Sequence, residues 1–542
     1  MIAWLLPAAL AAAPPEGGLV YFVFVDRFAD GLPDDSGTID RADPHAWHGG
    51  DLPGAEARLD HLAGMGVSTV WLSPVFNSRQ DKFHGHGAFH GYWVEDMDGV
   101  EARFGGNAAL SSLALAAKGR DIDLVLDMVY NHVSFDAPML QEHPDWFHPP
   151  QTIEDWNDPT EVVTHQVHGL PDLAQEEEAV YHYLLGRSLY WSHLTDAAGF
   201  RIDAVRHMPS DFLHQLSADL KAQRGEGFWI LGEDFQGDPL ALSESFRDGG
   251  FDAMFDFPLR YAMVDVFCND QPAGRLASVL SADRLYDDPH GLVTFLDNHD
   301  LPRIASECGG ERSRVEAALL FMFAVRGTPS ITYGTEWMLE GPGEPENRAD
   351  VPWEQPPVLA ETIRQLQALR ASHPSLSSRS AEDRLLEVSA ERLYLSRYAA
   401  GERAYILANR SDVPIAMVYS DAVQSWAVTT PSGLAVGDGS PPPIPPGGVG
   451  ITFTESTPWK PPEAAVVSLS GGEGWLVGSG PELGNWNPDE GVALGEGAEL
   501  TLPVGAVMEW KVVTRDVSGA VVWPEGANRY NLISGDTTIT VD

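Results

Sequence analysis

Basic residues are scarce in this sequence. Its 542 residues include 79 Asp and Glu but only 34 Lys and Arg, and only five of these are Lys, so the formal net charge is −45 at pH 7. A field of this sign repels nucleic acid and anionic membranes and argues against acidic substrates. We therefore expect neither nucleic acid nor a membrane as a partner. A solubilising acidic surface is a sufficient explanation of the charge, and a neutral substrate such as a glycan is permitted.

Cysteines and long hydrophobic runs are also few. Cys268 and Cys308 form either one disulfide or two unpaired thiols, and two cysteines do not decide between these states. The apolar stretch at residues 2–13 is too short to span a bilayer and ends in small residues, with an A-x-A-like cleavage site near Ala11 or Ala13. We predict that residues 1–13 are a signal peptide and that the protein is secreted or periplasmic.

Eight short β-rich runs recur between residues 19 and 334, separated by segments with apolar residues at helical spacing. They are residues 19–26, 67–73, 123–129, 199–205, 228–233, 251–257, 292–298 and 330–334. Alternation of strands and helices indicates a parallel sheet, and eight units indicate a closed (β/α)8 TIM barrel, an α/β fold. The long connection after the third run, residues 133–178, predicts an excursion from the barrel.

The helical pattern fades after about residue 375. Strand-like segments follow, and a Pro-rich stretch at 456–465 without apolar periodicity has the composition of a linker. We therefore predict a barrel over residues 14–375, a β-sandwich over 376–455, a linker over 456–465 and a second β-sandwich over 466–542.

Polar side chains gather at the ends of four predicted barrel strands. They are Asp127, Asn131 and His132 after the third strand, Arg201 and Asp203 on the fourth, Glu233 on the fifth, and Asp297, His299 and Asp300 on the seventh. The carboxyl ends of barrel strands meet at one mouth, where catalytic residues lie. The convergence of these groups predicts an active site, although any single one of them could be structural.

The stretch GFRIDAVRH places Arg201 and Asp203 two residues apart, on one face of a strand. A neighbouring cation lowers the pKa of a carboxyl group, so we expect Asp203 to be ionised and nucleophilic. Glu233 follows the apolar run FWIL with no cation beside it in the sequence, which favours a raised pKa and an acid role. Two such carboxyl groups suffice to hydrolyse a glycosidic bond. A plain ion pair lining the barrel is the alternative.

Five short motifs appear in order: DMVYNH (127–132), LPDL (170–173), GFRIDAVRH (199–207), ILGED (230–234) and FLDNHD (295–300). With them, residues 19 to about 450 resemble the α-amylase family, glycoside hydrolase family 13. The resemblance implies that Asp203 is the nucleophile and Glu233 the general acid/base. It implies that Asp300 is a third carboxylate, which holds sugar hydroxyls and distorts the ring.

The resemblance also implies a set of substrate contacts. They are His90 and the stacking Tyr92 from FHGYW (89–93), His132 and His299 as hydrogen-bonding groups, Arg201 as the orienting cation, Arg206 and His207 on the acceptor side, and Arg348 on the donor side. Two positions depart from the family pattern. Glu344 stands where an Asp is frequent, and Arg206 stands where many members have Lys.

A structural Ca²⁺ ion is a further implication of the resemblance. Asn131, Asp172 and the carbonyl of His207 fall on the matching positions, and oxygen ligands suit this ion. Asp158 and Glu161 are candidates for a fourth ligand. The alternative is a fold without the ion, in which Asn131 only stabilises a turn.

The C-terminal region resembles a starch-binding domain of carbohydrate-binding module family 20. The matching strings are WLVGSGPELGNWNP (475–488), MEWKVVTRD (508–516) and VVWPEGANRYN (521–531). The resemblance implies that Trp486 and Trp523 stack on sugar faces, with Lys511 and Asn528 as polar partners and Trp475 at a second site. The alternative places these tryptophans in the sandwich core.

The sequence is therefore interpreted as a secreted, monomeric α-amylase that cleaves α-1,4 bonds within starch and related glucans and retains the anomeric configuration. The short gap between residues 450 and 465 leaves no room for the additional domain typical of cyclodextrin glucanotransferases, which favours hydrolysis. The alternatives are such a transglycosylase, an exo-acting amylase that forms maltooligosaccharides and, more remotely, a glycan-binding protein without catalysis.

Overall fold

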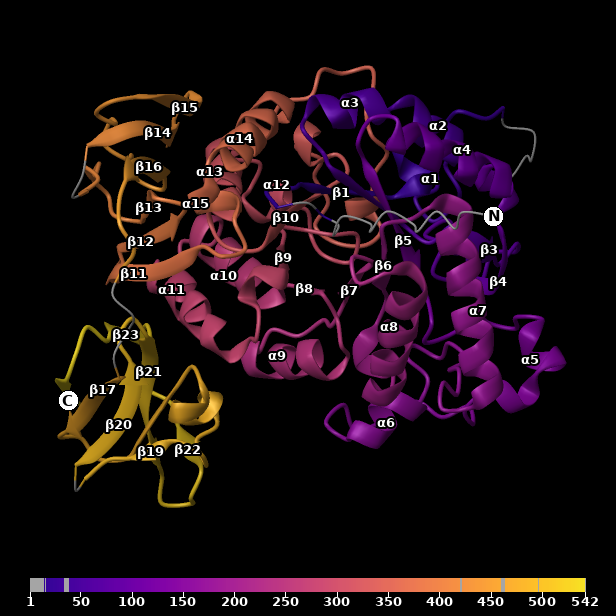
Figure 1. Cartoon of the computed structure of the whole chain (residues 1–542). Helices are drawn as coiled ribbons and strands as arrows, with labels where there is room; N and C mark the ends of the chain where they lie inside the picture. The colour runs from indigo at the N-terminus through magenta and orange to yellow at the C-terminus, as the bar shows by residue number, and fades with distance from the viewer. Residues whose placement is uncertain are drawn as a thin grey trace, which may run out of the picture.

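The protein consists of a barrel, a sheet domain and a C-terminal sandwich (Figure 1). The computed structural model describes residues 14, 16–33, 39–419, 422–459, 464–495 and 497–541. The predicted signal peptide, residues 1–13, and residues 460–463 of the predicted linker lie outside the described residues. None of the helices in the described ranges is long and apolar enough to cross a membrane.

The predicted eight-stranded parallel barrel is confirmed. Its strands are β1 (Val20–Val23), β2 (Thr69–Leu72), β5 (Asp123–Met128), β6 (Gly199–Ile202), β7 (Trp229–Gly232), β8 (Ala253–Phe255), β9 (Leu292–Thr294) and β10 (Thr328–Thr332). They close in the order β1-β10-β9-β8-β7-β6-β5-β2, so strands that follow one another along the chain are neighbours in space. Strands covered on both faces read as continuous apolar runs, which is why these segments stand out in the sequence.

Helices form the outer layer of the barrel. The longer ones are α2 (Leu52–Ala57), α3 (Leu59–Gly64), α4 (Gly106–Lys118), α7 (Glu178–Thr195), α8 (Ser210–Arg224), α9 (Pro239–Asp248), α10 (Phe257–Phe267), α11 (Gly274–Ser281), α13 (Arg312–Ala324) and α14 (Ala360–Ser372); α1 (Val25–Phe28), α12 (Ile304–Glu307) and α15 (Pro374–Ser377) are short. Asp238 and Asp256 cap α9 and α10 by accepting backbone N–H groups. Helix α13 is buried from Val315 onward because it lies between the barrel and the sheet domain.

The excursion after β5 is mostly irregular chain. It contains α5 (Met139–Glu142) and α6 (Pro159–Thr164) and returns to the barrel where His132 and Asp172 form an isolated β-bridge. A small antiparallel pair, β3 (Phe76–Ser78) with β4 (Val94–Val100), interrupts the second barrel unit. The sequence did not predict this pair, because β3 has only three residues, β4 (VEDMDGV) lacks an apolar run, and the register is irregular.

The domain after residue 375 differs from the expected two-layer sandwich. Its described strands form one antiparallel sheet in the order β11-β12-β13-β16-β14-β15: β11 (Glu382–Val388), β12 (Arg392–Ala399), β13 (Glu402–Asn409), β14 (Val423–Thr430), β15 (Gly433–Asp438) and β16 (Val449–Glu455). Along β13, Ala404 and Ile406 join the core shared with the barrel, whereas Tyr405 and Leu407 pack in a separate cluster. One face of the sheet is therefore covered by the barrel instead of a second sheet.

The C-terminal domain is a two-sheet sandwich. Its first sheet holds β20 (Ala498–Pro503), β17 (Ala464–Ser470) and β24 (Thr537–Thr540). Its second sheet holds β19 (Val492–Ala493), β18 (Trp475–Gly478), β21 (Val507–Arg515), β22 (Val521–Val522) and β23 (Arg529–Leu532). Trp510 lies in the core with 2% exposure. Trp475 and Trp486 are half-buried and Trp523 is 45% exposed, so these three are not core residues.

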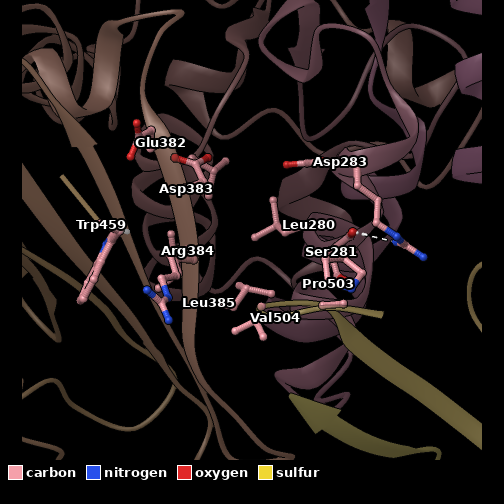
Figure 2. Close-up of a pocket in the computed structure, with 15 residues that line it drawn as sticks. Leu280, Ser281, Asp283, Glu382, Asp383, Arg384, Leu385, Trp459, Pro503 and Val504 are labelled. Atoms are coloured by element: carbon pink, nitrogen blue, oxygen red, sulfur yellow. Dashed lines mark hydrogen bonds between the residues drawn. The ribbon is translucent and has the colours of Figure 1, made fainter. Parts of the chain in front are cut away.

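The domains meet at a cavity of about 490 Å³, which Figure 2 shows between the barrel residue Leu280, Leu385 of β11 and Val504 of the sandwich. Trp459, from the predicted linker, lies at its edge. The guanidinium of Arg384 lies 4.7 Å from the centre of the Trp459 ring, and the indole Nε1 donates to Ser396 Oγ at 3.1 Å. The first part of the linker is therefore anchored to the sheet domain.

The two cysteines, whose state the sequence left open, form a disulfide. Cys268 follows α10 and Cys308 follows α12, and both side chains are buried. The bond joins segments 40 residues apart.

Candidate active site

Arg201 is the centre of the predicted site. Its side chain is 1% exposed and contacts three carboxyl groups. Nη1 lies 2.8 Å from Asp127 Oδ1 and 2.7 Å from Asp203 Oδ1, and Nη2 lies 3.0 Å from Glu233 Oε1. The ends of β5, β6 and β7 deliver these groups, so neighbouring strands of the barrel bring one cation and three acids together.

Asp127 holds the guanidinium in place. Trp71 Nε1 and the Tyr92 hydroxyl donate to Asp127 Oδ2 at 3.0 and 2.9 Å, while Arg201 donates to Oδ1. Burial raises the pKa of Asp127 to about 7, and all three neighbours are donors that favour its carboxylate form. The sequence placed Asp127 at a strand end but gave it no role. Its contact with Trp71 joins residues 56 positions apart, which no local pattern reveals.

Glu233 combines burial with one hydrogen bond and one ion pair. The expectation that it has no cation beside it is wrong, because Arg201 reaches across from the neighbouring strand. Burial nevertheless raises the pKa of Glu233 to about 8, against the opposing effect of Arg201. Ala204, whose φ of 51° lies in the left-handed region, donates its N–H to Glu233 Oε2 at 3.1 Å. Such strain is found at functional sites, where the surrounding structure maintains it.

Asp300 stands more open to solvent than the other two predicted catalytic groups, with a side chain that is 37% exposed. Arg348 Nη2 lies 3.0 Å from its Oδ1, and His299 Nε2 lies 3.0 Å from its Oδ2. Arg348 also pairs with Glu344, so the Glu that replaces the frequent Asp keeps a contact with the arginine.

Three histidines of the site are uncharged at neutral pH. Burial lowers the pKa of His90 and of His299 well below the ordinary value and lowers that of His132 as well. The ring of Tyr92 stacks on His299 with centroids 5.0 Å apart, and its backbone carbonyl lies 3.1 Å from His132 Nε2. Neutral imidazoles in fixed positions can donate and accept hydrogen bonds, as sugar hydroxyls require.

A cleft of about 480 Å³ opens at these residues. The predicted site residues that line it are His90, Tyr92, Asn131, His132, Asp203, His299, Asp300 and Arg348. His45, His86 and His168 also line it, although the sequence did not single them out. Four predicted catalytic or substrate-binding residues are not among the lining residues: Arg201, Arg206, His207 and Glu233. Arg201 and Glu233 lie behind Asp203 and Ala204, which do line the cleft and which they contact. Arg206 and His207 contact the excursion, through the carbonyls of Trp156 and Val162 respectively.

The predicted calcium ligands include two buried oxygens without a hydrogen-bond partner, Asn131 Oδ1 and Asp172 Oδ1. Gln175 Oε1 is a third such oxygen nearby in the chain, which the sequence did not indicate. Asp158 caps α6 and Glu161 accepts two backbone N–H groups, so both are engaged locally. No cluster of three or more His, Cys, Asp or Glu side chains that could hold a metal occurs within the described ranges. These buried oxygens without a hydrogen-bond partner fit a hard cation, which takes amide and carboxylate oxygens as ligands.

The predicted starch-binding residues all belong to the second sandwich sheet and its loops. The rings of Trp486 and Trp523 are 6.4 Å apart at an interplanar angle of 39°. Lys511 Nζ donates to the Pro524 carbonyl at 3.3 Å, beside Trp523, and Asn528 donates to Glu509 Oε1. Trp475 stands apart from this pair, under the guanidinium of Arg515.

Two family models match separate regions of the chain. The model of the α-amylase catalytic domain matches residues 22–368, and the model of the starch-binding domain matches residues 470–541.

Known proteins with related sequences act on α-glucans by more than one reaction. A cyclomaltodextrin glucanotransferase of Klebsiella oxytoca is 26% identical over 98% of this chain and 95% of its own length. A β/α-amylase of Paenibacillus polymyxa is 29% identical over 72% of this chain, which spans only 33% of that protein.

The solved structures that resemble this chain also include both an amylase and a glucanotransferase. An α-amylase of Anoxybacillus is 30% identical with a TM-score of 0.74, covering 82% of this chain and 99% of that one. A cyclomaltodextrin glucanotransferase described as having a three-domain ABC distribution is 25% identical with a TM-score of 0.71, covering 82% of this chain and all of its own.

Proposed function

Because this chain belongs to the α-amylase family, glycoside hydrolase family 13, and ends in a starch-binding domain, we propose that it hydrolyses α-1,4 bonds within starch and related glucans. The observation that carries the proposal is the contact of Asp203 and Glu233 with the two terminal nitrogens of one buried guanidinium. This arrangement holds two carboxyl groups close together, as retaining glycosidases require.

The two carboxyl groups take complementary roles. Glu233, whose pKa of about 8 keeps it protonated at neutral pH, donates its proton to the glycosidic oxygen as the bond breaks. Asp203 attacks the anomeric carbon and forms a covalent glycosyl ester. Glu233, now a carboxylate, accepts a proton from water. The water attacks the anomeric carbon and releases Asp203, so the configuration is retained.

The remaining cleft residues position the sugar. Asp300 is held by His299 and Arg348 and presents exposed carboxylate oxygens to hydroxyl groups. Tyr92, stacked on His299, provides an aromatic face for the apolar side of a glucose ring. Asp127 acts indirectly, since it orients Arg201, which in turn contacts Asp203 and Glu233.

Transglycosylation is the second candidate. Its support is the similarity to glucanotransferases over nearly the whole chain. The absence of an additional domain before the starch-binding domain no longer favours hydrolysis, because one related glucanotransferase is itself described by a three-domain arrangement.

The products formed from amylose discriminate between these reactions. We expect linear maltooligosaccharides of mixed length early in the reaction, because the proposed enzyme cleaves internal bonds and transfers the glycosyl group to water. The measurement is thin-layer chromatography over time, with a pre-reduced amylose sample as the control for end-directed cleavage. Cyclic dextrins as the main product would establish the transferase, and a single short product from the first minutes would establish exo-action.

We also propose that the protein is exported. The apolar residues 2–13 have the character of a signal-peptide core. The Cys268–Cys308 disulfide supports the same conclusion, since such bonds persist in oxidising compartments.

A structural Ca²⁺ ion between the barrel and the excursion is proposed as well. Asn131 Oδ1 and Asp172 Oδ1 would hold it, and the bound ion supplies positive charge to oxygens that are otherwise buried without a partner. Asn131 belongs to the segment after β5 and Asp172 to the returning excursion, so the ion would join the two segments.

Removal of calcium is expected to destabilise the protein. Excess EDTA should lower the melting temperature by several degrees, because a ligand at a hundredfold excess over its Kd contributes about 2.7 kcal/mol to stability. Scanning calorimetry checks this, with restoration by Ca²⁺ but not by Mg²⁺ as the specificity control. The variant Asn131→Leu should show no response to EDTA. An identical melting curve with and without EDTA in the unmodified protein would remove the ion from the proposal.

A further inference from the structure

A crevice of about 430 Å³ lies between the barrel and the starch-binding domain. On the barrel side it is lined by the segment from Gln236 to Leu240, which leads into α9, and by Tyr261 of α10. On the other side it is lined by Asn485 and Trp486. Figure 1 shows the starch-binding domain next to α11 and β11, on the same side of the barrel as α9.

Trp486 belongs to two surfaces at once. It lines the crevice, and its ring lies 6.4 Å from that of the exposed Trp523. Its backbone φ of 65° is in the left-handed region, an uncommon conformation for a large side chain. A glucan chain lying on the tryptophan pair would therefore reach the crevice without leaving an aromatic surface.

The barrel wall of the crevice begins on the loop that carries the catalytic group Glu233. Glu233 and Gln236 are three residues apart on one loop, so at most about 11 Å separates them. Between them Phe235 is 45% exposed, an unusual position for a large apolar side chain. Its ring contacts Phe257 at 4.5 Å, and the ring of Phe257 lies 6.3 Å from that of Tyr261. Phe257 itself is buried, so the accessible rings on this stretch are the exposed Phe235 near Glu233 and the half-buried Tyr261 in the crevice.

The crevice is a fixed feature because the starch-binding domain is docked on the barrel. Asn485 Nδ2 donates to Asp238 Oδ2 at 2.5 Å, Ser278 contacts Ser479 at 2.9 Å, and Arg284 pairs with Glu482 at 2.6 Å. Tyr530 packs so closely on α11 that a Cβ at Gly274 would lie 2.6 Å from its ring. A docked domain offers a pre-formed path, which lowers the entropy lost when a long ligand binds both parts.

We propose that this crevice is an α-glucan binding site, in which one chain runs from the Trp486–Trp523 pair across Tyr261 and Gln236 to the side of the cleft at Glu233. The chain stacks on the aromatic rings, and the side-chain amide of Gln236 and the hydroxyl of Tyr261 contact its hydroxyl groups. The proposal deepens the proposed function, on which it rests. A long chain bound in this way links two sites and gains affinity from both.

Isothermal titration of the full chain carrying Glu233→Gln, with maltotriose and with a linear maltodextrin of about 15 glucose units, tests the site without turnover. The long chain should bind one per protein and much more tightly than maltotriose. Adding Tyr261→Ala should lower the ratio of the two affinities about fivefold to tenfold, whereas Tyr261→Phe, which keeps the ring, should nearly restore it. Tyr190→Ala is the matched control, because Tyr190 is an exposed tyrosine on α7.

Several outcomes decide the proposal. Two long chains bound per protein, or an affinity ratio unchanged by Tyr261→Ala, would overturn it. If Tyr261→Ala fails to fold, Gln236→Ala provides the same comparison, with an expected loss of about threefold. Failure of the proposed function appears separately, as the absence of any product from amylose with the unmodified protein, and it leaves the binding result standing.

Discussion

Replacing Glu233 by Gln is expected to lower kcat on soluble starch by about 10²–10⁴-fold, the usual contribution of a general acid. Gln is similar in size, and its single amide oxygen can accept from either Arg201 or Ala204, but it has no acidic proton to donate to the glycosidic oxygen. Adsorption to granular starch should not change, because Trp486 and Trp523 lie on a separate domain. The measurement pairs initial rates with a sedimentation assay of bound protein.

The stability of the Glu233→Gln variant should depend on pH differently from that of the unmodified protein. A pKa raised in the folded state, here to about 8, means that the folded protein keeps a proton that the unfolded chain releases near pH 4.3. The contribution of Glu233 to stability is therefore present below pH 4.3 and is lost as pH rises towards 8. Since Gln does not titrate, the melting temperature of the variant should rise relative to that of the unmodified protein between pH 5 and pH 9.

The control for this prediction is Glu178→Gln, at an exposed position on α7. It should change neither the rate nor the pH dependence of the melting temperature. A Glu233→Gln variant with a rate within tenfold of the unmodified protein would remove Glu233 from the proton-transfer step.

The barrel was predictable because its strands are buried on both faces. Runs such as VYFV in β1 and WILG in β7 contain only residues that avoid water, and parallel strands require this. The sheet domain was less predictable for a related reason. The continuous apolar run AYILA along β13 indicates that both of its faces are covered, but it does not reveal that the barrel covers one of them.

The candidate site was likewise predictable in part. Side chains at strand ends can be assigned to one mouth from sequence alone, which is how Asp203 and Glu233 were chosen, whereas the role of Asp300 came from the family resemblance. Contacts between side chains on different strands cannot be assigned from the sequence. These contacts determine the electrostatic environment of each carboxyl group. The sequence paired Arg201 with Asp203 only, because they are neighbours on one strand. The structure adds Asp127 and Glu233 from the adjacent strands.

Docking of the starch-binding domain was also beyond the sequence. The composition of residues 456–465 indicated a Pro-rich linker, which says nothing about whether the domain after it packs on the barrel. Contacts such as Ser278 with Ser479 connect residues 201 positions apart and depend on the shapes of both surfaces. The anchored Trp459 shows that the linker itself is partly packed.

Replacing Arg201 by Gln is expected to abolish activity and to destabilise the barrel. Removing one partner of a buried ion pair costs about 3–5 kcal/mol, because the remaining charge stays buried without compensation. Here Asp127 and Glu233 both lose the cation that lowers their pKa, so burial raises the pKa of each still further. Near pH 5 both acids are protonated and carry no charge, so the loss of stability should be small there. It should grow as pH rises to 8, where the acids would ionise beside Arg201 in the unmodified protein.

Arg326→Gln separates the catalytic effect of Arg201 from the structural one. Arg326 is equally buried but pairs with Asp256 and Asp283, which are not carboxyl groups of the candidate site. Calorimetry should therefore show a lower melting temperature for both variants. Rates measured on the folded fraction at 20 °C should fall at least a hundredfold for Arg201→Gln only, since this variant alone changes the charge around Asp203 and Glu233. Equal rates for the two variants would mean that the guanidinium between the carboxyl groups serves the fold and not the reaction.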